Sequence, residues 1–331
     1  MDRAEQLRRW LNATLGEEPR IAPASDDASF RRYFRVRRGG GGPSLIAMDA
    51  PPDKESCEPF VRVARLFSAA GVHVPAIHAQ DISQGFLLLS DLGDTTYLSV
   101  LDARSAGVLY GHAVDALVRI QLATRHGELP DYDRRLLERE LRLFPDWYVA
   151  RQLGRSLSAA QAESLEMAFS AILANNLAQP RVFVHRDYHS RNLMVSEPCP
   201  GILDFQDAVC GPITYDLVSL LRDAYIAWEE ERAIDWTVRY WEKARAANLP
   251  VAPDFADFYR DFEFMGAQRQ LKVLGIFARL SLRDAKDGYL KDQPRVMGYL
   301  KRTCERYREL APLALLLDEL DATERRVGYT F

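Results

Sequence analysis

Three oxygen-bearing side chains, Asp187, Asn192 and Asp204, stand close together in the sequence. Apolar runs lead into and out of the loop that holds the first two, and Pro and Gly residues then make a turn before the third. Such a hairpin would bring the three side chains together. One carboxylate could orient a substrate hydroxyl and accept its proton, while an amide oxygen and a second carboxylate hold magnesium. This pattern predicts phosphoryl transfer, in which magnesium neutralises charge on the transferred group.

The same segment matches a longer signature, H-R-D-x-x-x-x-N followed by D-F, which is typical of kinases. It begins at His185, and its D-F pair is Asp204 with Phe205. A single buried aspartate beside a strand is more often a loop cap. Here the order, the spacing and the apolar flanking strands occur together, which favours the functional interpretation.

The same loop and the residues that follow it also match the motifs of one family. The sequence is similar to the aminoglycoside phosphotransferase and choline kinase superfamily, whose fold is that of the protein kinases. The family's loop H-x-D-x-H-x-x-N, its following acidic residue and its Gly-x-x-x-x-Asp-Leu pattern correspond to His185, Asp187, His189 and Asn192, to Asp204, and to Gly211, Asp216 and Leu217.

The resemblance implies an α+β fold with two lobes, a small β-rich N-lobe and a large α-helical C-lobe. It implies that Asp187 is the catalytic base and that Asn192 and Asp204 are the ligands of Mg²⁺ in an enzyme that uses ATP. The other motif residues would hold the catalytic loop by hydrogen bonds: we expect this of His185 and Asp216. We prefer the same role for His189, whose alternative is to face the phosphates.

The pattern of elements agrees with two lobes. We expect a β-hairpin over 32–36 and 44–48, a helix over 58–70 with Phe60, Val63, Ala64 and Phe67 on one face, and strands over 73–79 and 85–90. Helical periodicity then covers 107–124, 133–153, 159–178 and 215–320, interrupted by a β-rich segment from 181 to 205. We therefore place an N-lobe at 1–91, which binds nucleotide, and a C-lobe at 92–331, which holds the catalytic loop and the acceptor site.

Candidate nucleotide contacts lie in the N-lobe and at its end. The turn between the first two strands lacks G-x-G-x-x-G, but small residues such as Ser29 could bring backbone N–H groups near phosphate oxygens. The arginines that follow alternate with aromatic residues and are candidates for phosphate contact. The segment Leu88–Gly93 resembles the family hinge, where backbone groups would bind adenine, with guanine as the alternative. The predicted nucleotide contacts are Ser29, Arg31, Arg35, Ser90, Asp91 and Leu92.

One family feature is displaced. Met48 or Asp49 stands where the third strand of a kinase carries a phosphate-anchoring lysine, and Phe60 stands near the usual position of its glutamate partner. Arg35 or Lys54 could substitute. This departure favours an alternative of another class, a pseudokinase-like module that binds nucleotide without turnover. The intact residues of the catalytic loop argue against that alternative.

The acceptor site would lie in the helical lobe. Arginines beside aromatic residues suit a neutral or anionic sugar better than a polyamine, because Trp and Tyr stack on sugars and Arg binds carboxylates bidentately. Stretches such as ASFRRYFRV, AMDAPP and VHRDYHSRNLM resemble the bacterial anomeric kinases of N-acetylmuramate and N-acetylglucosamine in this superfamily, which serve peptidoglycan recycling. An aminoglycoside, choline or fructosamine is the alternative acceptor. The candidate acceptor residues are Trp147, Tyr148, Arg222, Asp223 and Arg269.

Composition excludes several other classes. The net charge of −4 argues against a nucleic-acid binder, even though residues 31–38 contain five arginines. No apolar run reaches the roughly 18 residues that span a bilayer, and the N-terminus does not resemble a signal peptide. The four cysteines lack metal-binding spacing, so we expect free thiols in a reducing compartment, the cytoplasm. No obligate protein partner is implied.

Overall fold

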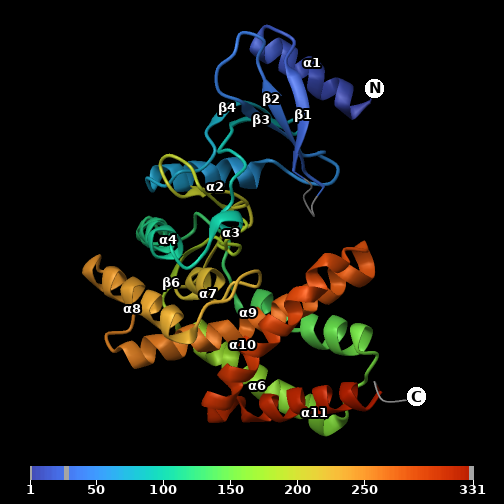
Figure 1. Ribbon diagram of the computed structural model, residues 1–331, viewed down its shortest axis with the longest axis vertical. Helices are drawn as coiled ribbons and strands as arrows, with labels where there is room; N and C mark the ends of the chain where they lie inside the picture. The colour runs from blue at the N-terminus through green and yellow to red at the C-terminus, as the bar shows by residue number, and fades with distance from the viewer. Residues whose placement is uncertain (1, 26–29, 328–331) are drawn as a thin grey trace. The chain divides into compact units, whose positions relative to one another are not determined.

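An antiparallel five-stranded sheet and one helix form the beginning of the computed structural model, which describes residues 2–25 and 30–327. The sheet has the order β1-β2-β3-β5-β4. The helix lies beside the sheet (Figure 1). Its Leu7 and Leu11 pack in one apolar cluster with side chains of β2, β3 and β5. The elements are α1 (Arg3–Leu15), β1 (Arg20–Ser25), β2 (Arg32–Arg37), β3 (Leu45–Asp49), β4 (Ile77–Asp81) and β5 (Phe86–Ser90).

The helix α1 was not expected from the sequence, although the i, i+4 spacing of its two buried leucines is a helical signal. The predicted face of the next helix, α2 (Glu58–Ala69), is confirmed, because all four of its apolar residues are buried. The strand expected over 73–79 was placed too early. It begins at Ile77, after Pro75, which has no backbone N–H to contribute to a ladder.

The described residues pack into two units, and the chain passes from one unit to the other three times. The first unit contains Met1–Ala123 and Arg191–Ala208, and the second contains Thr124–Ser190 and Val209–Phe331. Besides the sheet, the first unit holds α2, α3 (Tyr97–Val100), α4 (Ala106–Leu122) and a short hairpin of β7 (Leu193–Met194) with β8 (Gly201–Ile202). A functional division at residue 91 stays a prediction.

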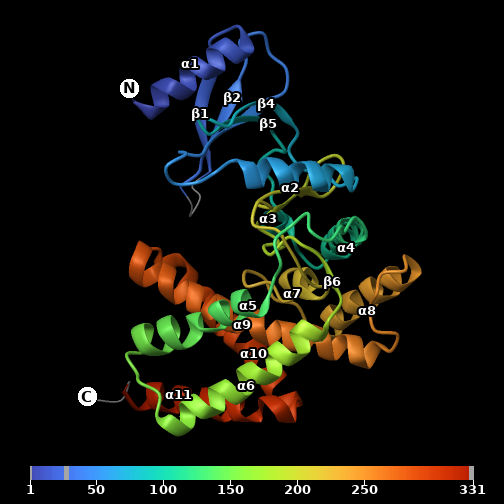
Figure 2. The ribbon, with the colours of Figure 1, turned by 180° about the vertical axis from the view of Figure 1, so that it is seen from behind.

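The second unit is built around one long helix, α9, which packs against α10, α7 and α6; α6 in turn lies beside α11 (Figures 1 and 2). A two-stranded antiparallel ladder, β6 with β9, supplies the strand that precedes the catalytic loop. The elements of this unit are α5 (Arg134–Leu141), η1 (Phe144–Gln152), α6 (Ala159–Ala178), β6 (Arg181–Val184), β9 (Val209–Pro212), α7 (Tyr215–Leu221), α8 (Glu230–Ala246), α9 (Phe255–Asp284), η2 (Asp287–Asp292), α10 (Gln293–Arg306), η3 (Arg308–Leu310) and α11 (Ala311–Val327).

A single helix over 133–153 was the wrong expectation. The chain forms an α-helix that ends at Leu141 and then a π-helix from Phe144, because Pro145 has no N–H to continue the α-helical ladder. The α+β class itself is confirmed. In the described part of the chain, no helix combines the length and the apolar character needed to cross a membrane.

Candidate functional site

The loop that follows β6 is held by a buried carboxylate of α7. Asp216 accepts hydrogen bonds from the backbone N–H groups of His185, at 2.6 Å, and of Arg186, at 3.0 Å. Arg186 has a φ of 77°, in the left-handed region that non-glycine residues rarely adopt. Such a backbone persists only where its surroundings hold it. Asp216 therefore fixes the chain immediately before Asp187.

The rest of this loop is also pinned through its backbone. The N–H of Asp187 donates to Nδ1 of the buried His185 at 3.2 Å, and the N–H of His189 donates to the Asp187 carbonyl at 3.0 Å. The N–H of Ser190 donates to the carboxylate of Asp223 at 2.9 Å. Asp223, predicted as an acceptor contact, thus has a position in which it holds the loop.

Asp187 opens onto a cavity of about 80 Å³ within the second unit. The ring of His189, which also lines this cavity, packs edge-on against Tyr225 with the ring centroids 5.3 Å apart. Of the five predicted acceptor residues, Arg269 lines the cavity. Its other lining residues are Tyr215, Ala224, Lys272, Val273, Ile276 and Phe277.

The charges around Asp187 favour its ionised form. Burial alone would raise the pKa of this carboxyl, but the charges of Lys272, His189, Arg269 and Arg186 outweigh burial and lower the pKa. Asp187 is therefore a carboxylate at neutral pH. It can accept a hydrogen bond from a hydroxyl group, and it can take the proton as the hydroxyl oxygen attacks.

Behind this cavity lies a cluster of buried charges that the motifs did not indicate. Lys272 Nζ lies 3.1 Å from Glu140 Oε1 and donates a hydrogen bond to the hydroxyl of Tyr215 at 2.9 Å. Arg186 and the hydroxyl of Tyr132 also bind the Glu140 carboxylate. Charged residues on the otherwise apolar faces of α5 and α9 were the available signal, because such residues are rarely buried without partners.

Three other acceptor candidates have partners inside the second unit. Arg222 pairs with Glu263 and donates to Thr303 at 2.8 Å. Trp147 has the Arg151 guanidinium 4.1 Å from its ring centroid. Tyr148 is buried and stacks on Phe144 with the centroids 5.3 Å apart. None of the three is among the described residues that line the Asp187 cavity, and their contact with an acceptor stays a prediction.

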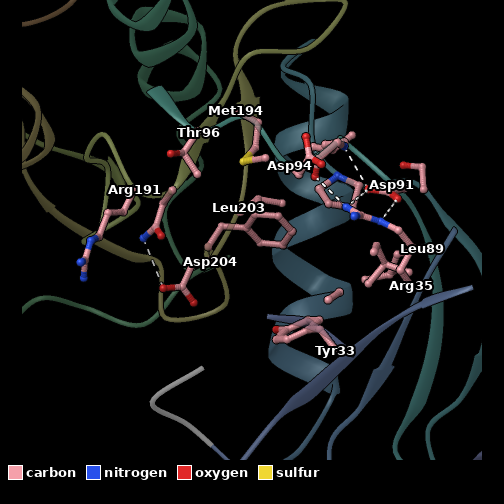
Figure 3. Close-up of a pocket in the computed structure, with 18 of the residues that line it drawn as sticks. Tyr33, Arg35, Leu89, Asp91, Asp94, Thr96, Arg191, Met194, Leu203 and Asp204 are labelled. Atoms are coloured by element: carbon pink, nitrogen blue, oxygen red, sulfur yellow. Dashed lines mark hydrogen bonds and ion pairs between the residues drawn. The ribbon is translucent and has the colours of Figure 1, made fainter. Parts of the chain in front are cut away.

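The first unit contains a larger cavity, of about 400 Å³. Its walls include Ile46, Leu89, Met194 and Phe205, which form an apolar surface of the kind that encloses a nucleotide base (Figure 3). Six of the predicted site residues line it together: Arg35, Ser90, Asp91, Leu92, Asn192 and Asp204.

An ion pair fixes the predicted hinge at this cavity. Arg35 Nε donates to Asp91 at 2.6 Å (Figure 3). Ser44 and the N–H of Gly93 donate to the same carboxylate at 2.7 and 3.0 Å. Burial raises the pKa of Asp91, but these hydrogen bonds outweigh burial and the pKa is lowered. Asp91 is therefore ionised, and its hydrogen bonds with residues of the first unit hold the segment 90–93 in place.

The two predicted metal ligands lie side by side. Asn192 Nδ2 donates to Asp204 Oδ2 at 3.3 Å (Figure 3). Gln206 Nε2 donates to Asp204 Oδ1 at 2.8 Å. The β7–β8 ladder brings them together, since Leu193 pairs with Ile202. Asp204 has a φ of 61°, a strained conformation at a predicted ligand. One carboxylate and one amide are the oxygen donors that Mg²⁺ takes from protein when phosphates supply the others, so this pair fits the ion.

The hairpin was expected to gather three side chains, and it joins Asn192 with Asp204 in the first unit. Asp187 belongs to the second unit, with four residues of chain between it and Asn192. Ser29 lies outside the described residues.

Arg31, one of the predicted nucleotide contacts, pairs with a glutamate of its own unit. Its Nε lies 3.1 Å from Glu55, just before α2. Burial lowers the pKa of Arg31, but the nearby Tyr33, Glu55, Asp207 and Asp204 outweigh it and raise the pKa. The proposed substitutes have other partners: Arg35 binds Asp91, and the exposed Lys54 lies beside Asp53. This arginine–glutamate pair, which interacts electrostatically with Asp204, was not predicted. The glutamate was expected within α2, and Glu55 precedes that helix.

Comparison with known proteins shows the family of the chain. Residues 20–253 match the model of the phosphotransferase enzyme family. An N-acetylmuramate/N-acetylglucosamine kinase of Pseudomonas aeruginosa is 51% identical over 329 residues, which cover 96% of this chain and 97% of that protein. The choline kinase LicA from Streptococcus pneumoniae superimposes with a TM-score of 0.62 at 12% identity, covering 90% of this chain and 98% of the other. The ADP-bound aminoglycoside phosphotransferase APH(2'')-Ib gives a TM-score of 0.55 at 15% identity. The superposition covers 89% of this chain and 97% of that protein.

These likenesses confirm the family resemblance, the kinase-like fold and the prediction of a phosphotransferase. The match to the family model extends from β1 into α8 and so includes the catalytic loop and both predicted metal ligands. The chain belongs to the phosphotransferase enzyme family.

Proposed function

We propose that this protein is an ATP-dependent kinase that phosphorylates the anomeric hydroxyl of N-acetylmuramate and N-acetylglucosamine. The observation that carries the proposal is Asp187, a partly buried carboxylate kept ionised by surrounding cations at a cavity of the second unit. The name of the relative that shares half of its residues over nearly the whole chain supports these two sugars as acceptors. Both are building blocks of peptidoglycan, so we place the reaction in peptidoglycan recycling. The use of ATP suggests the cytoplasm.

The first unit would bind the nucleotide. The 400 Å³ cavity would enclose the base between its apolar walls, with the backbone of Ser90 and Leu92 as hydrogen-bonding partners. Asn192 and Asp204 would hold Mg²⁺, which when bound neutralises charge on the phosphates. Arg31, held by Glu55, would take the place of the missing lysine as a phosphate contact.

The second unit would supply the acceptor side of the reaction. The ionised Asp187 would accept a hydrogen bond from the sugar hydroxyl and then its proton during transfer. His185, Asp216 and Asp223 would act through the backbone of the loop by holding it in place. The cations that surround Asp187 disfavour a polycationic aminoglycoside or a choline at this cavity, since like charges repel.

A phosphate-transfer assay tests this function. The protein is incubated with ATP, magnesium and each sugar, with choline and an aminoglycoside in parallel, and ³¹P NMR locates the phosphate. We expect an anomeric phosphate signal with the two sugars. Asp187→Asn should lower turnover by about 10²–10⁴-fold, the usual contribution of general-base catalysis. Asp204→Ala should remove turnover by weakening metal binding.

Asp53→Asn, at an exposed surface carboxylate, serves as the matched control and should leave turnover unchanged. Transfer to choline or the aminoglycoside alone would overturn the acceptor assignment. Full activity of Asp187→Asn would overturn the role of this carboxylate. Nucleotide binding without transfer to any acceptor would favour the pseudokinase-like module.

A further inference from the structure

The cavity at Asp187 contains a buried cation, Arg269, that no carboxylate of the described residues contacts directly. Its charge acts on Asp187 and Asp216 at longer range. Arg269 is only 6% exposed, and its guanidinium forms no hydrogen bond or ion pair with residues 2–25 or 30–327. The other two cations nearby are compensated, since Lys272 and Arg186 share the carboxylate of Glu140. Burying an unpaired charge is costly, and buried arginines are normally paired. The Arg269 guanidinium is therefore suited to pair with an anionic group of a bound ligand.

The remaining walls of the cavity identify the kind of anion. Val273, Ile276 and Phe277 follow Arg269 on one face of α9, at i+4, i+7 and i+8, and Ala224 adds a further apolar wall. The cavity of about 80 Å³ is well below the roughly 300–1,000 Å³ of sites that enclose a whole small molecule. It suits a small substituent that carries both an anionic group and an aliphatic group.

We infer that Arg269 binds a carboxylate of the acceptor, attached through a short aliphatic group that packs against Val273, Ile276 and Phe277. The inference rests on the proposed function and deepens it. N-acetylmuramate differs from N-acetylglucosamine by a lactyl ether, which consists of one carboxylate, one methyl group and the ether carbon. A transferring phosphoryl group is the other anion of the reaction, but it would gain nothing from three apolar side chains. Arg269 therefore determines the preference for the acidic sugar.

The test removes the charge from each partner in turn. Values of kcat/KM are measured for N-acetylmuramate and for its neutral carboxamide, with wild type and with Arg269→Gln. Wild type should prefer the acid by about 10- to 100-fold, the range of charge-assisted hydrogen bonds. Arg269→Gln should abolish this preference. Both values will also fall by a common factor, because Arg269 helps to keep Asp187 ionised, so the ratio is the measurement that decides.

Two further variants sharpen the result. Arg269→Lys keeps the charge but not the planar fork, and it should restore part of the preference. Arg283→Gln, at an exposed arginine of the same helix, should leave the ratio as in wild type. N-acetylmuramate should raise the melting temperature of wild type more than that of Arg269→Gln.

The contrary outcomes are distinct. If Arg269→Gln lowers kcat/KM for the acid and the amide equally, the residue serves the phosphoryl group or Asp187, and the inference is wrong. If Arg269→Gln unfolds while Arg269→Lys folds without any change in the ratio, the role is structural, and the inference is again wrong. If wild type phosphorylates neither N-acetylmuramate nor N-acetylglucosamine, the proposed function itself fails.

Discussion

Two neighbouring carboxyl groups of the second unit have opposite ionisation tendencies. Asp187 is partly buried and Asp216 is fully buried, and burial raises the pKa of each. Four cations outweigh burial at Asp187. At Asp216 two backbone hydrogen bonds are too weak to outweigh burial, and the negative charge of Asp187 adds to the effect of burial. The pKa of Asp216 therefore rises to about 7. Environments that separate the pKa values of two acids give them separate roles, one reacting and one holding the loop.

The raised pKa of Asp216 predicts a pH dependence of stability. An unfolded aspartate has a pKa of about 3.9, so between about pH 4 and pH 7 the folded protein retains a proton that the unfolded chain releases. This contribution to stability is complete at low pH and is lost as the pH rises to about 7. Asp216→Asn does not titrate. The unfolding free energy of wild type relative to this variant should therefore fall as the pH is raised from 5 to 7.

Urea unfolding at several pH values measures this difference. The control is Asp53→Asn, at an exposed position, for which the difference from wild type should stay flat over the same range. A constant gap between wild type and Asp216→Asn would show that Asp216 is already ionised at pH 5.

At the scale of elements, Glu140 joins α5 to α9 and to the catalytic loop. Its carboxylate binds Lys272, Arg186, Tyr132 and the side chain of Gln268, the last at 3.2 Å. Glu140→Gln would leave two buried cations without a counter-charge. We expect it to lower the unfolding free energy by about 3–5 kcal/mol, measured by urea denaturation.

The matched variant on the same helix is Glu138→Gln. Glu138 forms an exposed i, i+4 pair with Arg134 at 3.3 Å, and such pairs contribute at most about 0.5 kcal/mol. Similar losses for the two variants would contradict the assigned importance of the buried cluster.

The packing of α9 against η1 depends on a glycine. A Cβ atom at Gly275 would lie 2.3 Å from the backbone carbon and oxygen of Leu143, so neither helix could keep its place. Replacing a helical glycine by alanine usually stabilises by about 0.5–1 kcal/mol. We expect Gly275→Ala to do the opposite and to lower stability by about 1–3 kcal/mol, as overpacking does.

Thermal melting checks this prediction against Gly298→Ala in α10. A Cβ at Gly298 meets nothing within 4 Å, so this variant should gain the ordinary stabilisation. An equal gain at Gly275 would mean that the two helices can separate without cost.

At the scale of the whole molecule, the sequence was informative where residues that act together are close in the chain. Asp187, Asn192 and Asp204 belong to one motif, and α2 and β5 follow simple periodicities, so these could be predicted. The buried cluster of Glu140 with Lys272 and Arg186 could not be predicted. Its members lie on elements far apart in the chain, and no periodicity records which charges meet. Arg31 with Glu55 was hidden for a related reason, since the pair departs from the family's spacing.

The interleaving of the two units has a consequence for synthesis on the ribosome. All residues of the apolar cluster that joins α1 to the sheet have been synthesised once the nascent chain has passed Leu88. Domains generally fold as units, beginning with the N-terminal one. Asn192 and Asp204 emerge only after residues 124–190, which belong to the other unit. A chain arrested at residue 123 would therefore carry the sheet and the hinge without either metal ligand. If the proposed roles of Asn192 and Asp204 hold, the polypeptide acquires magnesium-dependent recognition of the nucleotide late in translation.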